Sequence, residues 1–380
     1  MRGLAVASIL LLAAVPAASQ RYKFTINTET PEGQLLAQIG QEEDASKKLG
    51  LLEQFAGKFP KHEAIGWVYS QMVPTYTKTG QFDKALEAGE KVLAIDPGDL
   101  ESAHAALQAA EGKKDPDAVL LWVPRVSDLA RKVGQSEKPK EAEEAEEWKR
   151  RADFAKQLDT YTEYALYAMT LQSTDPRKKI ALGEMLQQRS PQSQYLAQVS
   201  SQLFTAYMQA GESQKAVALA EKVLEKGQAD EGMMLAVADS YRAQQKEPDK
   251  VYALCAKVME LAKTTPKPAA VPEAAWQQRQ VQLSGRAQYI AGVMYAMQSK
   301  WKEADESLRA ALPGIKDDQN MTAEALFYLG LTNYRLGEQG DTERIADAVR
   351  FNEQCAAIAG PYQARARTNL KAIRGKYRVK

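Results

Sequence analysis

Histidine is the first side chain to consider for chemistry, and the sequence contains only two, His62 and His104. His62-Glu63 begins like the helix of a zinc protease, in which two histidines four residues apart bind the metal. Four residues after His62 the chain has Gly66, so the second ligand is missing. His104 belongs to an alanine-rich stretch and is interpreted as a packed or half-exposed side chain. We therefore predict no metal site and no histidine-based catalysis.

The two cysteines, Cys255 and Cys355, each fall late in a predicted helix, on its apolar side. A disulfide needs Cα atoms within about 7 Å, and in an extended helical stack these positions are too far apart. We predict two buried free thiols, which behave as small hydrophobic side chains. The sequence has no glycine-rich phosphate loop, and its many carboxylates form no distinctive pair. It therefore predicts a protein that is not an enzyme and needs no cofactor.

The composition indicates which elements must position these side chains. Of the 380 residues, 44% are hydrophobic and 26% are charged, as in ordinary soluble proteins with a sizeable core. Ala, Leu, Glu, Lys and Gln dominate, and these residues favour helices. Segments with period-two alternation of β-branched residues are missing, so no sheet is expected.

The stretch 285–312 shows how the helices are paired. Its two halves each carry apolar residues at the three- and four-residue spacing of one helix face, and Ser299-Lys300 interrupts the pattern between them. Two antiparallel helices with so short a turn form a helical hairpin. Gly292 and Ala304 have almost no side chain, so the two backbones can approach closely there. A hairpin this short cannot bury both of its faces and needs neighbours of the same kind.

The same register recurs elsewhere in the chain. With Ala304 as the reference, it is repeated around Ala85, around Ala216 and, in part, around Gly330. The matching residues are Tyr69, Met72, Tyr76, Gly80, Phe82, Ala85, Val92 and Pro97; Leu203, Tyr207, Gly211, Ala216 and Val223; and Leu326, Leu329, Gly330 and Gly337. At these residues the chain resembles the tetratricopeptide repeat (TPR) family, whose 34-residue unit is a helix–turn–helix with marks of this kind.

The resemblance implies the fold class. We expect an all-α protein: an α-solenoid of stacked antiparallel helical hairpins, forming a TPR-like right-handed superhelix with a C-terminal capping helix. About eight hairpins are expected before the cap. Pro74 is predicted to interrupt and kink the helix that contains it, and Pro124 is predicted to break its helix.

Composition shifts divide the chain into candidate segments. We predict a signal peptide (1–19), a polar leader (20–29), N-terminal hairpins (30–133), central hairpins that include a long charged helix (140–262), C-terminal hairpins with the cap helix (272–374) and a basic tail (375–380). The proline-rich stretch 264–272 is the clearest internal boundary.

The N-terminus has the features of a targeting segment. Arg2 provides a positive charge, residues 4–15 form an apolar run, and Ala17-Ala18-Ser19 is a cleavage site of small residues. The apolar run is shorter than the roughly 20 residues that span a bilayer. We therefore expect export by a cleaved signal peptide to the periplasm or the extracellular space, and we expect no transmembrane span.

The charges of the predicted mature chain cancel, which argues against a protein built to coat nucleic acid. The residues from Pro361 onward nevertheless contain seven basic side chains and no acidic one. This basic tail could touch an anionic surface. The alternative is a solvated capping helix with cations near its C-terminal end, which the helix dipole favours.

The resemblance also places a candidate binding groove. In TPR proteins, positions 2, 5, 9 and 12 of the first helix of each hairpin face the groove. In the two C-terminal hairpins these positions include Arg286, Tyr289, Val293, Phe327, Leu331 and Tyr334, which we predict as partner-binding residues. Apolar side chains at such positions suit a partner peptide or helix. The alternative is that repeat packing or the protein's own cap helix buries them.

Three functions follow from these expectations. The first is a non-catalytic protein–protein interaction scaffold of the cell envelope, which binds a partner peptide or helix in its concave groove. The second is a structural subunit of an envelope complex that acts through its convex face. The third, which the open repeat pattern disfavours, is a polysaccharide-acting enzyme on a helical toroid.

Overall fold

The computed structural model describes residues 21–341 and 343–377, and all regular structure in these ranges is helical. The predicted signal peptide and residues 378–380 of the predicted tail lie outside the described residues. The helices are α2 (Pro31–Gln41), α3 (Ala45–Lys58), α4 (Ile65–Lys78), α5 (Phe82–Ile95), α6 (Leu100–Lys113), α7 (Pro116–Gly134), α8 (Ala142–Gln172), α9 (Pro176–Arg189), α10 (Leu196–Gln209), α11 (Ser213–Glu225), α12 (Glu231–Ala243), α13 (Pro248–Thr264), α14 (Glu273–Met297), α15 (Trp301–Ile315), α16 (Gln319–Glu338), α17 (Arg344–Ala357) and α18 (Gln363–Tyr377).

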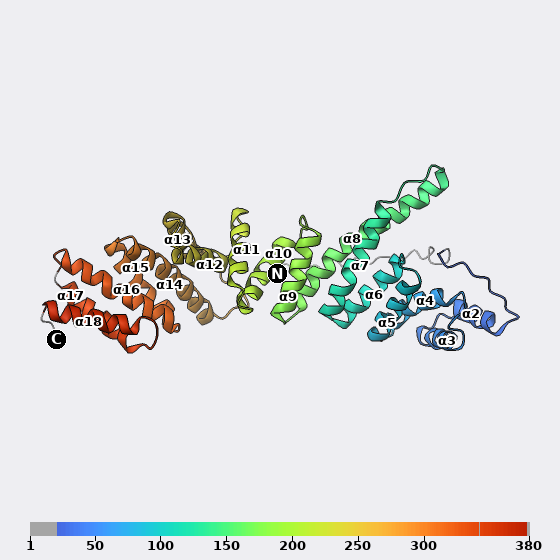
Figure 1. Cartoon of the computed structure of the whole chain (residues 1–380), viewed down its shortest axis with the longest axis horizontal. Coiled ribbons are helices and arrows are strands. Elements are labelled where there is room, and N and C mark those ends of the chain that lie inside the picture. The colour runs from blue at the N-terminus through green and yellow to red at the C-terminus, as the bar shows by residue number, and fades with distance from the viewer. Residues whose placement is uncertain (1–20, 342, 378–380) are drawn as a thin grey trace. The chain divides into compact units, whose positions relative to one another are not determined.

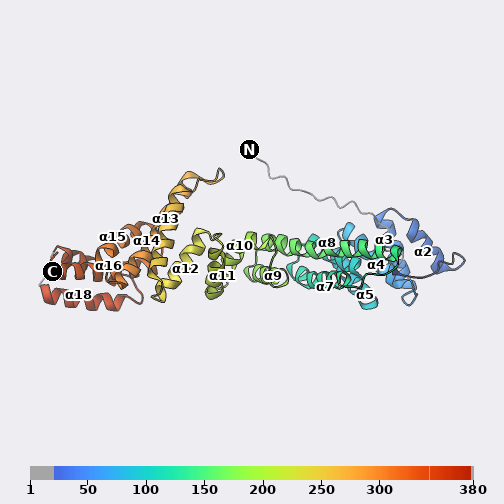
Figure 2. The same cartoon turned by 90° about the horizontal axis from the view of Figure 1, so that it is seen from above.

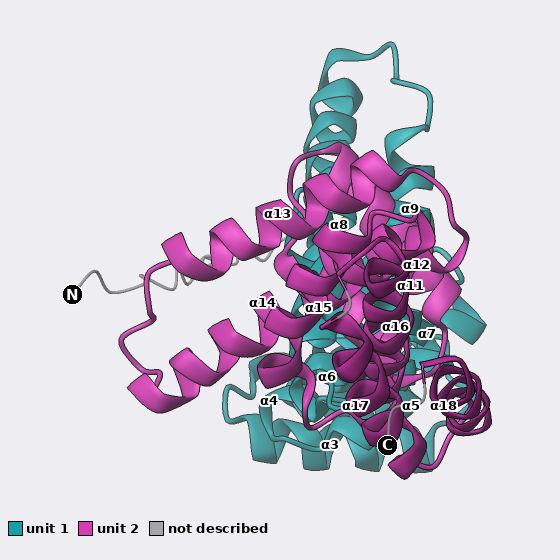
Figure 3. Ribbon diagram, turned by 90° about the vertical axis from the view of Figure 1, so that its left-hand side faces the viewer, with its two compact units in different colours: residues 1–202 teal, residues 203–380 magenta. Residues whose placement is uncertain are grey.

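The chain divides into two compact units, residues 1–202 and residues 203–380 (Figure 3). We call them unit 1 and unit 2. The boundary lies within α10, inside the segment 140–262 that the sequence predicts as the central group of hairpins. In Figure 3 the C-terminal end of α13 and the N-terminal end of α14 extend away from the other helices of unit 2.

Consecutive helices pack against one another in chain order, from α2 to α9 in unit 1 and from α11 to α18 in unit 2 (Figures 1 and 2). Alternate helices also touch, as α4 and α6 do in unit 1 and α12 and α14 do in unit 2. Contact with the next helix and the next but one is what a stack of hairpins requires. The predicted TPR-like α-solenoid is confirmed, and α18 packs on the last helix pair as the predicted cap.

Aspartate side chains fix the start of many helices. Asp115 and Asp175 each precede a proline at the first helical position and accept hydrogen bonds from backbone N–H groups of the first turn. Such caps satisfy donors that have no partner inside the helix, and proline at this position has no N–H to satisfy. An Asp-Pro pair before an apolar run is therefore a helix start that the sequence itself marks.

Two helices run through prolines that were expected to interrupt them. Pro124 lies inside α7, so the expected break is absent. Pro74 lies inside α4, which continues to Lys78. A proline costs a helix one backbone hydrogen bond and adds a steric clash. Val73 is completely buried, as are Val123 and Val126, and this burial offsets the cost.

The small residues allow turns and close helix crossings. Gly80 and Gly211 have φ angles of +75° and +76°, a left-handed conformation that glycine adopts at little cost. A Cβ atom at Gly292 would lie 2.7 Å from Cγ of Leu308, so this glycine admits a leucine side chain. The backbones of α14 and α15 meet further along, where a Cβ at Gly285 would lie 2.6 Å from Cα of Gly314.

Each unit has its own hydrophobic core. Trp122 and Phe55 are among the largest fully buried side chains of unit 1, and Met294 and Leu308 of unit 2. Helix α18 buries one side against α17, through the residues Ala366, Leu370 and Ile373. No helix in the described part of the chain is both long enough and apolar enough to cross a membrane.

Candidate functional site

The predicted groove residues of α14 have different environments. Arg286 is exposed, whereas Val293 is completely buried and Tyr289 is 3% exposed. The Tyr289 hydroxyl donates a hydrogen bond of 2.5 Å to Glu324 of α16. Arg242 of α12 donates to the same carboxylate at 3.1 Å, and its guanidinium lies 5.4 Å from the centre of the Tyr289 ring. Side chains of three first helices therefore fill this part of the predicted groove.

The protein's own C-terminal segment covers the predicted residues of α16. Phe327 is 5% exposed, because the Tyr362 ring lies 5.1 Å from it and the Arg365 guanidinium 4.5 Å from its centre. Tyr334 is half-buried and meets the Tyr377 ring edge-to-face at 6.3 Å. Leu331 is also half-buried. Partner binding at these residues stays a prediction, since part of the surface they would offer is occupied by α18 and the residues before it.

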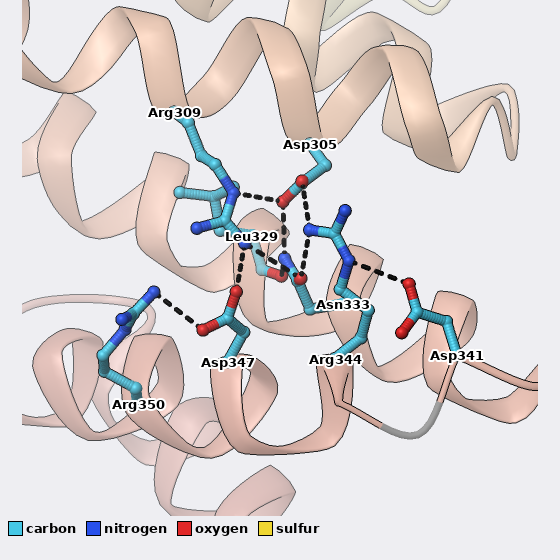
Figure 4. Close-up of polar contacts among 8 residues, drawn as sticks. All are labelled: Asp305, Arg309, Leu329, Asn333, Asp341, Arg344, Asp347 and Arg350. Carbon is cyan, nitrogen blue, oxygen red and sulfur yellow. Dashed lines mark hydrogen bonds and ion pairs between the residues drawn. The ribbon is translucent and has the colours of Figure 1, made fainter.

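A buried polar network joins α15, α16 and α17 (Figure 4). At its centre, Asp305 is 4% exposed and accepts hydrogen bonds from Arg309 at 2.8 Å, from Asn333 at 2.7 Å and from Arg344 at 2.6 Å. Arg309 also donates to Asp347 at 2.5 Å. The charged groups are paired with one another, so the network holds three helices together and leaves no charge aimed at a ligand.

A different surface stands out in unit 1, on the first helices α6 and α8. Its residues share the spacing of the predicted groove positions: an interval of three residues, then four, then three. They are Glu101, His104, Gln108 and Glu111 in α6, and Tyr161, Tyr164, Ala168 and Leu171 in α8. We call this surface the first-helix face. Tyr164 is 46% exposed and Leu171 is 43% exposed.

Tyrosine rings extend this face toward α10. The Tyr161 and Tyr164 ring centres are 6.2 Å apart, and Tyr164 lies 6.3 Å from Tyr167. Tyr167 stacks on Tyr195 with a ring separation of 4.8 Å and an interplanar angle of 17°. Four aromatic rings thus form a continuous strip, with one exposed and three half-buried members.

The polar groups beside this strip carry unusual pKa values. Burial lowers the pKa of His104 to about 4, so its ring is neutral near pH 7. The ring lies edge-to-face with Tyr161 at 5.2 Å. Burial raises the pKa of Glu111, although the hydrogen bond of 2.6 Å from the Tyr161 hydroxyl opposes that shift. The first-helix face is therefore aromatic and carries carboxylates, without a charged histidine.

The sequence contained the signal for this face, because the groove spacing applies to α6 and α8 as well as to the C-terminal hairpins. The α6–α7 and α8–α9 pairs lack the turn glycine and the small residue that set the register, so their groove positions emerge only once the helix ends are known.

The cysteines and the basic side chains of the C-terminal segment make contacts within the protein. Cys255 and Cys355 are both buried and free, as predicted, and burial raises their pKa values to about 12 and about 11. In the described ranges, no three His, Cys, Asp or Glu side chains are grouped so that they could hold a metal ion. In the C-terminal segment, Arg374 and Lys376 pair with Glu353 and Glu338.

A pocket of about 460 Å³ opens in unit 2 between α13, α14 and α15. Its polar lining consists of Lys263, Gln280, Ser284 and Gln288, and Val281 lies among them with 48% of its surface exposed. None of the predicted groove residues lines this pocket.

No protein-family model and no curated protein matches the chain. Among solved structures, the P58(IPK) TPR domain is similar with a TM-score of 0.31 and 12% identity, over 91% of this chain and 98% of that one. Yeast Tom70 has a TM-score of 0.23 and 11% identity over 93% and 90%. A chain of Naa15/Naa10 bound to HypK-THB has a TM-score of 0.21 and 13% identity over 92% and 64%. These TM-scores are too low to support an assignment of the fold. We therefore assign the fold from the helix packing within each unit.

Proposed function

We propose that the protein is a non-catalytic scaffold for protein–protein interactions, which binds a peptide or helix of a partner on the first-helix face of unit 1. The observation that carries this proposal is the exposure of Tyr164 and Leu171 on the side of α8 that bears the groove positions. A strip of exposed apolar and aromatic side chains beside polar ones is typical of interaction sites. Tyrosine suits this role because its large rigid ring gives contact area at a low cost in side-chain entropy.

The structural-subunit alternative assigns binding to the second helices instead. Leu121 of α7 is 48% exposed and provides a matched residue on a second helix of the same unit. The two proposals therefore differ in which exposed apolar side chain a partner needs.

The test is affinity capture of proteins from a cell-envelope fraction, quantified by mass spectrometry. We expect the amount of specifically captured partner to fall at least tenfold with the double variant Tyr164→Ser/Leu171→Ser. With Leu121→Ser the captured amount should equal that of the wild type. Circular dichroism should show the same helix content in all three proteins, because none of the replaced side chains is buried. Loss of capture with Leu121→Ser alone would instead favour the structural-subunit function.

We further propose that the scaffold works in the periplasm or outside the cell, after removal of residues 1–19. The charged, apolar and small-residue regions of the N-terminus support this location. N-terminal sequencing of the protein from its host should give Gln20 as the first residue. A protein that retains Met1 or Arg2 would contradict the proposed export.

A further inference from the structure

Hydrogen bonds from a tyrosine hydroxyl to a glutamate carboxylate recur in this chain, and three of them include a cation. Tyr76 donates to Glu53, and the Lys84 ammonium lies 3.0 Å from that carboxylate and 5.4 Å from the Tyr76 ring centre. In the pair of Tyr289 with Glu324, the cation is Arg242. In the pair of Tyr334 with Glu338, it is Lys376, 2.7 Å from the carboxylate and 5.4 Å from the ring centre.

The pair of Tyr161 and Glu111 on the first-helix face lacks this third member. Among the described contacts, the Glu111 carboxylate accepts the hydrogen bond from Tyr161 and forms no ion pair with a lysine or arginine. The His104 ring, which lies edge-to-face with Tyr161, is neutral near pH 7 and supplies no positive charge. Burial raises the pKa of Glu111, because removal from water disfavours the charged carboxylate, and the hydrogen bond from Tyr161 opposes this shift.

A second tyrosine ring, that of Tyr164, lies beside this pair. Tyr164 lies 6.2 Å from Tyr161 and is 46% exposed, so a side chain can reach it from solvent. A planar guanidinium can lie over a tyrosine ring and at the same time donate two hydrogen bonds to a carboxylate. The ammonium groups of Lys84 and Lys376 also contact both a carboxylate and a tyrosine ring. A guanidinium differs from them because its planar fork donates two parallel hydrogen bonds to one carboxylate and stacks flat on a ring.

We infer that the first-helix face takes an arginine side chain from the bound partner segment, with its guanidinium over the rings of Tyr161 and Tyr164 and hydrogen-bonded to the carboxylate of Glu111. The partner thereby supplies the cation that Arg242 supplies within unit 2. This inference rests on the proposed function, since it names the chemistry of the partner at the same face.

The experiment titrates the full chain with the short peptide acetyl-Gly-Ser-Arg-Ser-Gly-amide. Binding is followed by the NMR signals of isotope-labelled tyrosine rings, assigned with Tyr161→Phe and Tyr164→Phe. We expect the peptide to shift the Tyr161 and Tyr164 signals, and we expect the peptide with citrulline in place of arginine to leave them unchanged.

Glu111→Gln should weaken binding about tenfold, since it removes the charge from the hydrogen-bond acceptor. Its matched control is Glu163→Gln, which is also half-buried but lies outside the face positions and should bind the peptide as the wild type does.

Three outcomes would overturn the inference: equal binding of the citrulline peptide, unchanged affinity in Glu111→Gln, or equal affinity for a peptide with lysine at the same place. The proposed function has a separate readout. If Glu111→Gln captures envelope partners normally while Tyr164→Ser/Leu171→Ser does not, the scaffold proposal stands and the arginine assignment fails. If the arginine peptide binds but capture does not depend on Tyr164, the scaffold proposal fails at this face.

Discussion

Asp305 is a buried carboxylate whose charge is held by two arginines, Arg309 and Arg344. We predict that Asp305→Asn destabilises unit 2 by about 3 kcal/mol, because breaking a buried ion pair leaves its partners uncompensated. The free energy of unfolding can be measured by urea denaturation followed by circular dichroism. Asp317→Asn is the control, since Asp317 is exposed and its loss should change little. Equal stability of the two variants would show that the network in Figure 4 is dispensable for folding.

His104 should make the stability of unit 1 depend on pH. Its pKa is about 4 in the folded protein, because burial disfavours the charged ring, and about 6.5 in an unfolded chain. Between these values the unfolded chain binds more protons than the folded protein. The neutral His104 ring therefore makes its full contribution to the stability of the folded protein above pH 6.5. We predict a loss on the order of 2 kcal/mol as the pH falls from 6.5 to 4.

Glu111 acts in the opposite direction in the same experiment. Its raised pKa means that the folded protein takes up this proton more readily than the unfolded chain, so acidification through that pKa is relatively stabilising. Urea denaturation between pH 7 and pH 4 should show a shallower loss for His104→Gln and a steeper loss for Glu111→Gln than for the wild type. The same pH profile in His104→Gln and the wild type would mean that His104 titrates normally in the folded protein.

At the scale of the helix pair, the crossing of α14 and α15 depends on two glycines that touch. A Cβ at Gly285 would lie 2.6 Å from Cα of Gly314, which no rotamer change can relieve. We predict that Gly285→Ala destabilises the protein by about 2 kcal/mol, because the backbones must move apart. Gly50→Ala in α3 is the matched control: its Cβ would meet nothing within 4 Å, so it should stabilise by about 0.5 kcal/mol through helix propensity. Thermal denaturation of both variants decides the matter, and a neutral Gly285→Ala would contradict the tight crossing.

The elements themselves were largely predictable, because local chemistry marks them. The capped starts at Asp115-Pro116 and Asp175-Pro176 and the ends of the linker 264–272 agree with the helices. The continuity through Pro74 and Pro124 was missed, since it depends on how much burial offsets a lost hydrogen bond. Whether burial outweighs the lost hydrogen bond depends on the tertiary contacts of the helix, and the presence of a proline in the sequence does not show these contacts.

The candidate site was harder to predict than the helices. Spacing alone gives the face of a helix, but it does not say what lies against that face. Tyr289 and Phe327 have the predicted spacing and are nonetheless buried, by Arg242 of α12 and by Tyr362 and Arg365 of the C-terminal segment. Tyr164 has the same spacing and is exposed. The difference depends on contacts between residues that lie far apart in sequence, such as the pair of Arg242 with Glu324.

At the scale of the whole molecule, the two units have separate hydrophobic cores, and this should appear as separate stability. Leu52 is completely buried in the core of unit 1, and Leu308 in the core of unit 2. In a stack of hairpins, each element is stabilised mainly by its neighbours, so a defect spreads over short distances. Truncation of a buried leucine to alanine costs about 2–5 kcal/mol.

We predict that Leu52→Ala speeds amide hydrogen exchange in α2 to α5 but leaves α14 to α17 unchanged, and that Leu308→Ala does the reverse. Mass spectrometry of peptides gives the exchange rates of both units in each variant. The unit without the substitution is therefore the control for the unit that carries it. Faster exchange along the entire chain in either variant would mean that the hairpins unfold as one cooperative block.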